Sequence, residues 1–94
     1  MATFIVRHKV RDYSVWKKVF AEHGKVRAQY GFTKSRVYRY VDDPNHVIVV
    51  CEVKDINKAK ALASAPELAT AMKEAGVVEE PKMFYLDDGE SFPN

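Results

Sequence analysis

The sequence has one cysteine, four glycines and no long hydrophobic run, and each of these shortages excludes a class of protein. A single cysteine excludes an internal disulfide and any site that is built on a pair of thiolates. No apolar run approaches the roughly 18 residues that a membrane-spanning helix needs. The glycines form neither a phosphate-binding loop nor a dinucleotide-binding motif. We therefore expect no disulfide scaffold, no membrane partner and no flavin or nicotinamide cofactor.

Neither sign of charge is in large excess, with 15 Lys and Arg against 13 Asp and Glu and a formal net charge of +2. The basic residues are scattered, and Lys17 and Lys18 are the only adjacent pair. Proteins that bind nucleic acid usually gather Lys and Arg into one patch, so we expect no nucleic acid partner. The first ten residues, MATFIVRHKV, lack the long apolar segment of a cleavable signal, which predicts a cytoplasmic protein.

The chain does have enough apolar sequence for one core. Its 94 residues are 47% hydrophobic and 30% charged, which is typical of a single globular domain over residues 1–94. Only the tail DDGESFPN, residues 87–94, lacks a hydrophobic pattern, and we expect it to be flexible or to contact a partner. A domain this small leaves much apolar surface exposed on folding, so a homodimer is expected.

Apolar and β-branched residues in short runs predict four strands. These are TFIVRHKV at 3–10, TKSRVYRYV at 33–41, HVIVVCEV at 46–53 and KMFYL at 82–86. The first strand places its more apolar set on one face, namely Phe4, Val6, His8 and Val10. The DDPN segment, 42–45, predicts a turn that makes the second and third strands a hairpin. The third strand is apolar on both faces, with Cys51 as an inert core residue, and therefore needs two covers.

A first helix is predicted from Tyr13 to Tyr30. Asp12 is a good N-cap, and Gly31 can end the helix in the left-handed conformation. At 100° per residue one arc collects the apolar side chains together with His23 and Arg27. Its members are Val15, Trp16, Val19, Phe20, His23, Val26, Arg27 and Tyr30. His23 therefore lies near the centre of the face that we expect to be buried.

Two shorter helices are predicted after the third strand. Asp55 can cap the first of them. The tetrad SAPE, Ser64 to Glu67, has the form of a capping box with proline in the first turn, and predicts a separate helix that carries Met72 and ends at Gly76. The order of elements predicts an α+β, ferredoxin-like βαββαβ fold with helices on one face of a four-stranded antiparallel sheet. Ile48 and Val50 on the other face predict sheets packed face to face in a dimer.

The run VRHKVRDYSVWKKVFAEH, the turn DDPN and the segment SAPELATAMKEAGVVEEP resemble small members of the dimeric α/β barrel superfamily, in particular the antibiotic biosynthesis monooxygenases. The resemblance covers roughly residues 3–86. It implies a pocket between helices and sheet, and a cofactor-independent monooxygenase that acts on a small aromatic or polyketide-like substrate. A polyketide cyclase or a non-catalytic ligand-binding module stays open as an alternative. The haem-degrading branch is disfavoured, because the first strand has no asparagine and the late helix no histidine.

His8 and His23 are the candidate catalytic residues, because they are the only groups on otherwise apolar faces that can exchange protons near neutral pH; the resemblance implies that they lie on opposite walls of the pocket. A histidine with a pKa near its ordinary value of about 6.5 can take a proton from a phenolic or enolic substrate. The candidate substrate-binding residues are Trp16, Phe20, Arg27, Tyr40 and Met72. We expect the rings to stack on a flat substrate and Arg27 to stabilise an oxyanion. The three histidines lack metal-ligand spacing, so no metal is expected, and a purely structural role for His8 and His23 stays open.

Overall fold

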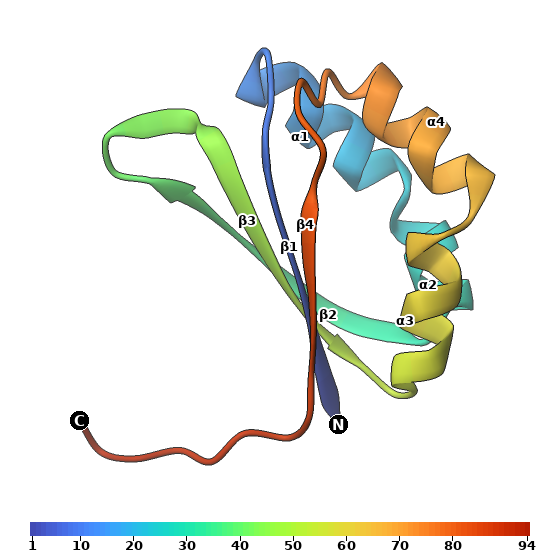
Figure 1. Ribbon diagram of the computed structural model, residues 1–94, viewed down its shortest axis with the longest axis vertical. Helices are drawn as coiled ribbons and strands as arrows, with labels where there is room; N and C mark the ends of the chain where they lie inside the picture. Colours follow the sequence, from blue (N-terminus) through green and yellow to red (C-terminus); the bar gives the residue numbers. More distant parts are fainter.

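The computed structural model, which describes residues 1–94, has four helices on one face of a four-stranded antiparallel sheet (Figure 1). The strands are β1 (Ala2–Lys9), β2 (Phe32–Tyr40), β3 (Asp43–Val53) and β4 (Lys82–Leu86). The helices are α1 (Tyr13–Glu22), α2 (Gly24–Gln29), α3 (Ile56–Ala63) and α4 (Pro66–Glu74). The strand order β2-β3-β1-β4 is that of the ferredoxin-like fold, and it confirms the predicted α+β class.

The core lies between the helices and the sheet. The helix-facing residues of β3 are at most 2% exposed, and they are Val47, Val49, Cys51 and Val53. On the neighbouring strand β1, Phe4 pairs with Cys51, Val6 with Val49 and His8 with Val47. The predicted apolar face of the first strand is therefore the face that the helices cover, and His8 lies on it.

Local sequence determines where most helices begin and end. Asp12 accepts a hydrogen bond of 2.9 Å from the backbone N–H of Ser14, and Asp55 does the same for Asn57 at 2.9 Å. Both are N-caps as predicted. Gly31 has a φ of 82°, a left-handed conformation that glycine adopts without the steric penalty of a Cβ. The chain can therefore leave α2 and enter β2 directly.

The single helix predicted from Tyr13 to Tyr30 is wrong, because the helix breaks at His23. This residue has φ −91° and ψ 11°, in the sparsely populated bridge region, and α2 begins at Gly24. Glycine is about 1 kcal/mol less favourable than alanine inside a helix, which lowers the cost of a break at this point. The guanidinium of Arg27 donates a hydrogen bond of 2.7 Å to the Phe20 carbonyl oxygen and so spans the break.

The capping box predicted from Ser64 to Glu67 is also wrong. The Ser64 hydroxyl donates to the Lys60 carbonyl oxygen at 3.0 Å, so it serves the end of α3 and not the start of α4. Ala65 is the N-cap of α4 and makes no side-chain cap. The physical reason is that α3 ends directly before α4 begins, and its free carbonyl groups compete for the same hydroxyl.

The hairpin turn lies earlier than predicted. Tyr40 pairs with Asp43, so the loop is Val41 and Asp42, and Pro44 belongs to β3. A register shift follows Arg39, which provides the irregular stretch in which a strand tolerates a proline. The hairpin between β2 and β3 projects away from the helices in Figure 1.

The second face of the sheet carries no helix, as Figure 1 shows. In register on that face lie Ile5, Ile48, Val50, Tyr38, Phe84 and Leu86. Tyr38, Phe84 and Leu86 are between 41% and 48% exposed. The tail after Leu86 has no regular structure and extends away from the helices (Figure 1). No helix combines the length and apolar character needed to cross a membrane.

Candidate functional site

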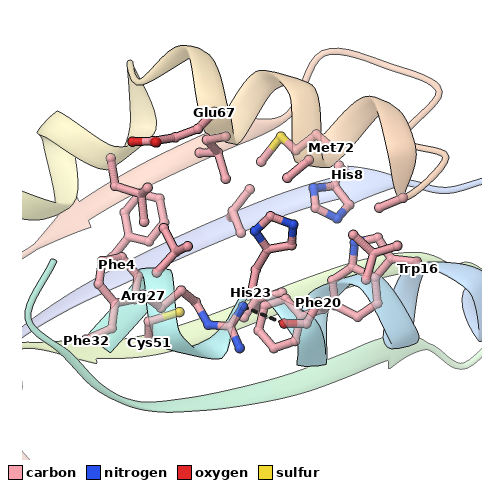
Figure 2. A pocket seen from close by; sticks show the side chains of 18 residues that line it. Phe4, His8, Trp16, Phe20, His23, Arg27, Phe32, Cys51, Glu67 and Met72 are labelled. Atoms are coloured by element: carbon pink, nitrogen blue, oxygen red, sulfur yellow. Dashed lines mark hydrogen bonds between the residues drawn. The ribbon is translucent and has the colours of Figure 1, made fainter. Parts of the chain in front are cut away.

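A cavity of about 120 Å³ lies between the helices and the sheet, and 14 of its 18 lining residues are hydrophobic. The four others are His8 on β1, His23 between α1 and α2, Arg27 on α2 and Glu67 on α4 (Figure 2). His8 is 2% exposed, whereas the other three are half-buried or exposed. The inner end of the cavity therefore lies at the buried His8, among apolar side chains, and the cavity reaches solvent on the side of α2 and α4.

The imidazole of His8 is buried without a hydrogen-bond partner on either ring nitrogen. The indole of Trp16 meets it edge-on, with ring centroids 5.7 Å apart and an interplanar angle of 63°. Burial lowers the pKa of His8 from 6.5 to about 4; the carboxylate of Glu79 opposes this shift and the charge of His46 adds to it. His8 is therefore neutral at pH 7, with one N–H donor and one acceptor nitrogen facing an apolar space.

His23 owes its position to the break in the helix. Its ring extends from the junction of α1 and α2 into the cavity, on the side toward His8 (Figure 2). The residue is half-buried, so it lies between the buried interior and the solvent. The two histidines named as candidates from the sequence thus line one cavity, and only His8 is cut off from water.

The aromatic residues of α1 form a column that arginines close at both ends. Trp16 stacks on Phe20 at 4.9 Å and 17°, and on its other side Tyr13 stacks on Trp16 at 5.7 Å and 26°. The guanidinium carbon of Arg27 lies 3.6 Å from the centre of the Phe20 ring. The guanidinium carbon of Arg39, from β2, lies 4.1 Å from the centre of the Tyr13 ring. Burial lowers the pKa of Arg27 from its usual value.

This column changes the expected role of Trp16 and Phe20. Both faces of Phe20 are covered, one by Trp16 and the other by Arg27. The faces of Trp16 are covered by Tyr13 and Phe20. Trp16 and Phe20 therefore use these faces on one another, on Tyr13 and on Arg27, and their stacking on a flat substrate stays a prediction.

Tyr40 is the one predicted site residue that does not line the cavity. It lies near the tip of the β2–β3 hairpin, where it stacks on His46 at 3.7 Å and 15°. Alternation along β2 explains this, because Tyr38 lies on the uncovered face and Arg39 contacts α1, so Tyr40 does not face the helices. Met72 does line the cavity, from α4 (Figure 2). Nowhere in the chain do three His, Cys, Asp or Glu side chains come together as a metal site.

Among the lining residues that were not sequence-based candidates, two carry an ionisable group, Glu67 and Cys51. Glu67 was assigned to a capping box, but its carboxylate instead accepts a hydrogen bond of 2.9 Å from the Tyr30 hydroxyl. Cys51 was assigned to the core; it is buried and also borders the cavity, and Ser35 donates to its sulfur at 3.4 Å. Burial raises the pKa of the Cys51 thiol.

The helical spacing of Glu67 with Ala71 and Ala75 would have placed Glu67 on the cavity face of α4. These residues recur at intervals of four, and all three line the cavity. The same intervals relate Leu68 to Met72. The position of Glu67 on the cavity face could therefore have been predicted from helical spacing, but the capping-box pattern assigned its carboxylate to the start of the helix.

No family model matches the sequence, and no curated protein matches it. Solved structures match over almost the whole chain. SnoaB, a cofactor-independent oxygenase from Streptomyces nogalater, is 20% identical with a TM-score of 0.73, and the match covers 99% of this chain and 97% of SnoaB. A structure described as an antibiotic biosynthesis monooxygenase is 12% identical with a TM-score of 0.69, over 96% of this chain and 100% of the other. A candidate antibiotic biosynthesis monooxygenase from Bordetella bronchiseptica reaches a TM-score of 0.79 at 10% identity, over 95% and 97%.

Proposed function

From the ferredoxin-like fold that this chain shares with antibiotic biosynthesis monooxygenase structures, we propose that it is an oxygenase that needs no bound cofactor. Its substrate is a small hydroxylated aromatic molecule, held in the cavity between helices and sheet. The observation that carries the proposal is a pair of histidines, one fully buried and one half-buried, in a cavity that is otherwise mostly apolar. SnoaB, which has the same fold, is described as a cofactor-independent oxygenase.

The reaction proposed is the oxidation of a phenol to a para-quinone by dioxygen. One oxygen atom enters the ring at the para carbon, and the other leaves as water with the hydroxyl hydrogen and the para hydrogen. The hydroxyl proton must be removed first, because the phenolate gives up an electron to dioxygen far more readily than the phenol does. A residue in the cavity must therefore act as a general base.

We assign the role of base to His23 and a hydrogen-bonding role to His8. With a pKa of about 4, His8 would accept a proton from a phenol of pKa about 10 only at a cost of about 8 kcal/mol. His23 lies toward the solvent side, where a proton taken from the substrate can pass to water. Arg27 supplies a positive charge on the same wall, which favours the phenolate.

The uncovered face of the sheet supports a homodimer. Its apolar side chains come from three different strands, with the exposed Tyr38 on β2, the half-buried Ile48 on β3 and the exposed Phe84 on β4. Soluble monomers rarely expose a continuous apolar sheet face, whereas two such faces pack well about 10 Å apart. The proposed dimer is a pair of sheets in contact, with both cavities on the outer sides.

Oxygen uptake with para-unsubstituted phenols tests the proposal. His23→Gln should lower kcat by on the order of 10²- to 10⁴-fold, the usual contribution of a general base. His46→Gln is the matched control, because His46 lies outside the cavity, and it should leave kcat within about twofold. Full turnover in His23→Gln would show that the assigned base is wrong. If phenols bind but no dioxygen is consumed, the cavity belongs to a ligand-binding module.

A further inference from the structure

The imidazole of His8 has lost its water without gaining a protein partner. It is 2% exposed, neither nitrogen has a hydrogen-bond partner, and its one aromatic neighbour, Trp16, meets it edge-on. A buried donor or acceptor left unpaired is destabilising, and native structures retain few of them. Because both nitrogens belong to a residue that lines the cavity, a group that enters the cavity can supply the missing hydrogen bond.

Of the other polar groups of the cavity, the two that carry a charge lie away from His8, and only the ring of His23 extends toward it (Figure 2). Arg27 and Glu67 are on α2 and α4 at the end marked by Phe4 and Phe32, whereas His8 lies at the end marked by Trp16 and Met72 (Figure 2). A carboxylate placed at His8 would have apolar walls, no fixed positive charge and only the imidazoles of His8 and His23 as partners, too little to offset the loss of its water. An uncharged hydroxyl fits, since it can donate to one nitrogen or accept from the other.

The size of the cavity limits the rest of the ligand. Its volume of about 120 Å³ is smaller than an engineered apolar cavity of about 150 Å³ that takes up benzene in another protein. The column of stacked rings along α1 forms one wall, and its ring faces are already covered, so a ligand cannot gain space by sliding between them. A fused polycyclic molecule exceeds the space beside His8 and would have to extend out through the open side between α2 and α4.

We propose that the cavity is specific for a molecule with a single six-membered ring that carries an uncharged hydroxyl group, and that this hydroxyl pairs with His8 at the inner end. As a statement about the substrate of the oxygenase, it rests on the proposed function. As a statement about binding, it stands on the unpaired nitrogens and the volume of the cavity.

A ligand series tests size and hydroxyl separately in the unmodified protein. Calorimetric titrations with phenol, 2-naphthol and 2-hydroxyanthracene compare one, two and three rings, and toluene replaces the hydroxyl of phenol by a methyl group. We expect phenol to bind at least about tenfold more tightly than 2-hydroxyanthracene, and also more tightly than toluene. Equal or tighter binding of the three-ring compound overturns the size limit, and a preference for toluene overturns the hydroxyl site.

A pair of matched variants locates the hydroxyl. His8→Leu removes both nitrogens and keeps an apolar side chain of similar size, so its preference should reverse in favour of toluene. His46→Leu makes the same change outside the cavity and should keep the preference of the parent protein. An unchanged ratio of the two affinities in His8→Leu overturns the pairing with His8. If this variant does not fold, movement of the His8 ring signals by phenol, and not by toluene, provides the same test.

Oxygen uptake measured alongside separates this inference from the proposed function. If phenol binds at His8 and no dioxygen is consumed, the oxygenase is wrong and the binding inference stands. If a three-ring phenol is oxidised and single-ring phenols neither bind nor react, the oxygenase stands and the size limit is overturned.

Discussion

The hydroxyl of Tyr30 donates a hydrogen bond of 2.9 Å to the carboxylate of Glu67, and so joins the end of α2 to the first turn of α4. This hydrogen bond is the main reason why the pKa of Tyr30 is raised. Since Glu67 lines the cavity and Arg27 on α2 lines it too, the contact connects the two helices that border the open side.

Replacing Tyr30 by Phe should loosen this side of the cavity with little effect on stability. The hydrogen bond is exposed to water, so its loss should leave the free energy of unfolding almost unchanged. Dissociation of phenol, followed by NMR line shapes, should become several-fold faster. Tyr38→Phe, which removes a hydroxyl from the opposite face of the sheet, is the control and should change neither quantity. An unchanged dissociation rate in Tyr30→Phe would mean that the contact does not restrict access.

The buried His8 predicts a specific sensitivity to acid. Its pKa falls from 6.5 in the unfolded chain to about 4 in the folded protein. Burial of the neutral His8 therefore costs no protonation free energy above pH 6.5. As the pH falls toward 4, the free energy of unfolding decreases by about 3 kcal/mol, because the unfolded chain binds the proton and the folded protein does not. Glu79 and His46 are the titratable neighbours that modulate this loss.

Urea unfolding of the parent protein and of His8→Leu between pH 8 and pH 4 measures this contribution. The parent should lose up to about 3 kcal/mol more than the variant over that interval. Above pH 7 the two curves should run parallel, because His8 is then neutral in both states. Parallel curves down to pH 4 would show that the imidazole is not buried in the free protein.

Two glycines near the site predict opposite effects of the same substitution. Gly24 has no positive φ, and an added Cβ would meet only Arg27 at an ordinary distance of 3.7 Å. Gly24→Ala should raise the free energy of unfolding by up to about 1 kcal/mol. Gly31→Ala, at φ 82°, should lower it by about 1 kcal/mol or more. Thermal unfolding of both variants checks the signs, and equal effects would contradict the assigned backbone conformations.

A charge on the uncovered sheet face should separate the proposed dimer. Ile48→Lys places an ammonium group in the middle of this face, between the register partners Arg7 and Tyr38. Sedimentation should then give a monomer with an unchanged circular dichroism spectrum. Val41→Lys, at the fully exposed hairpin loop, is the control and should remain a dimer. A dimer that persists in Ile48→Lys would place the interface elsewhere.

The elements that depend on neighbouring residues in the chain could be predicted from the sequence. The alternation of Phe4, Val6 and His8 identified the covered face of β1, because side chains of a strand point alternately to its two sides. Asp12 and Asp55 cap helices because their carboxylates reach amide groups two residues ahead. The cavity position of His23 followed from helical spacing even though the helix itself breaks at that residue.

What could not be predicted depends on contacts between distant segments. Glu67 accepts a hydrogen bond from Tyr30, 37 positions earlier, a pairing that no local pattern encodes. The position of Tyr40, by contrast, could have been predicted, because alternation along β2 places it on the uncovered face with Tyr38. Ser64 had two helix ends within reach, and the choice between them depended on how closely α3 and α4 follow each other.

The column of rings along α1 places the only tryptophan of the chain against the cavity. Indole emission responds to the polarity and to the quenchers around the ring, and Trp16 has His8 at its edge and Phe20 on its face. A molecule that enters the cavity should therefore change the intrinsic fluorescence of Trp16. The fold contains its own optical probe, and occupancy of the cavity can be followed without a label.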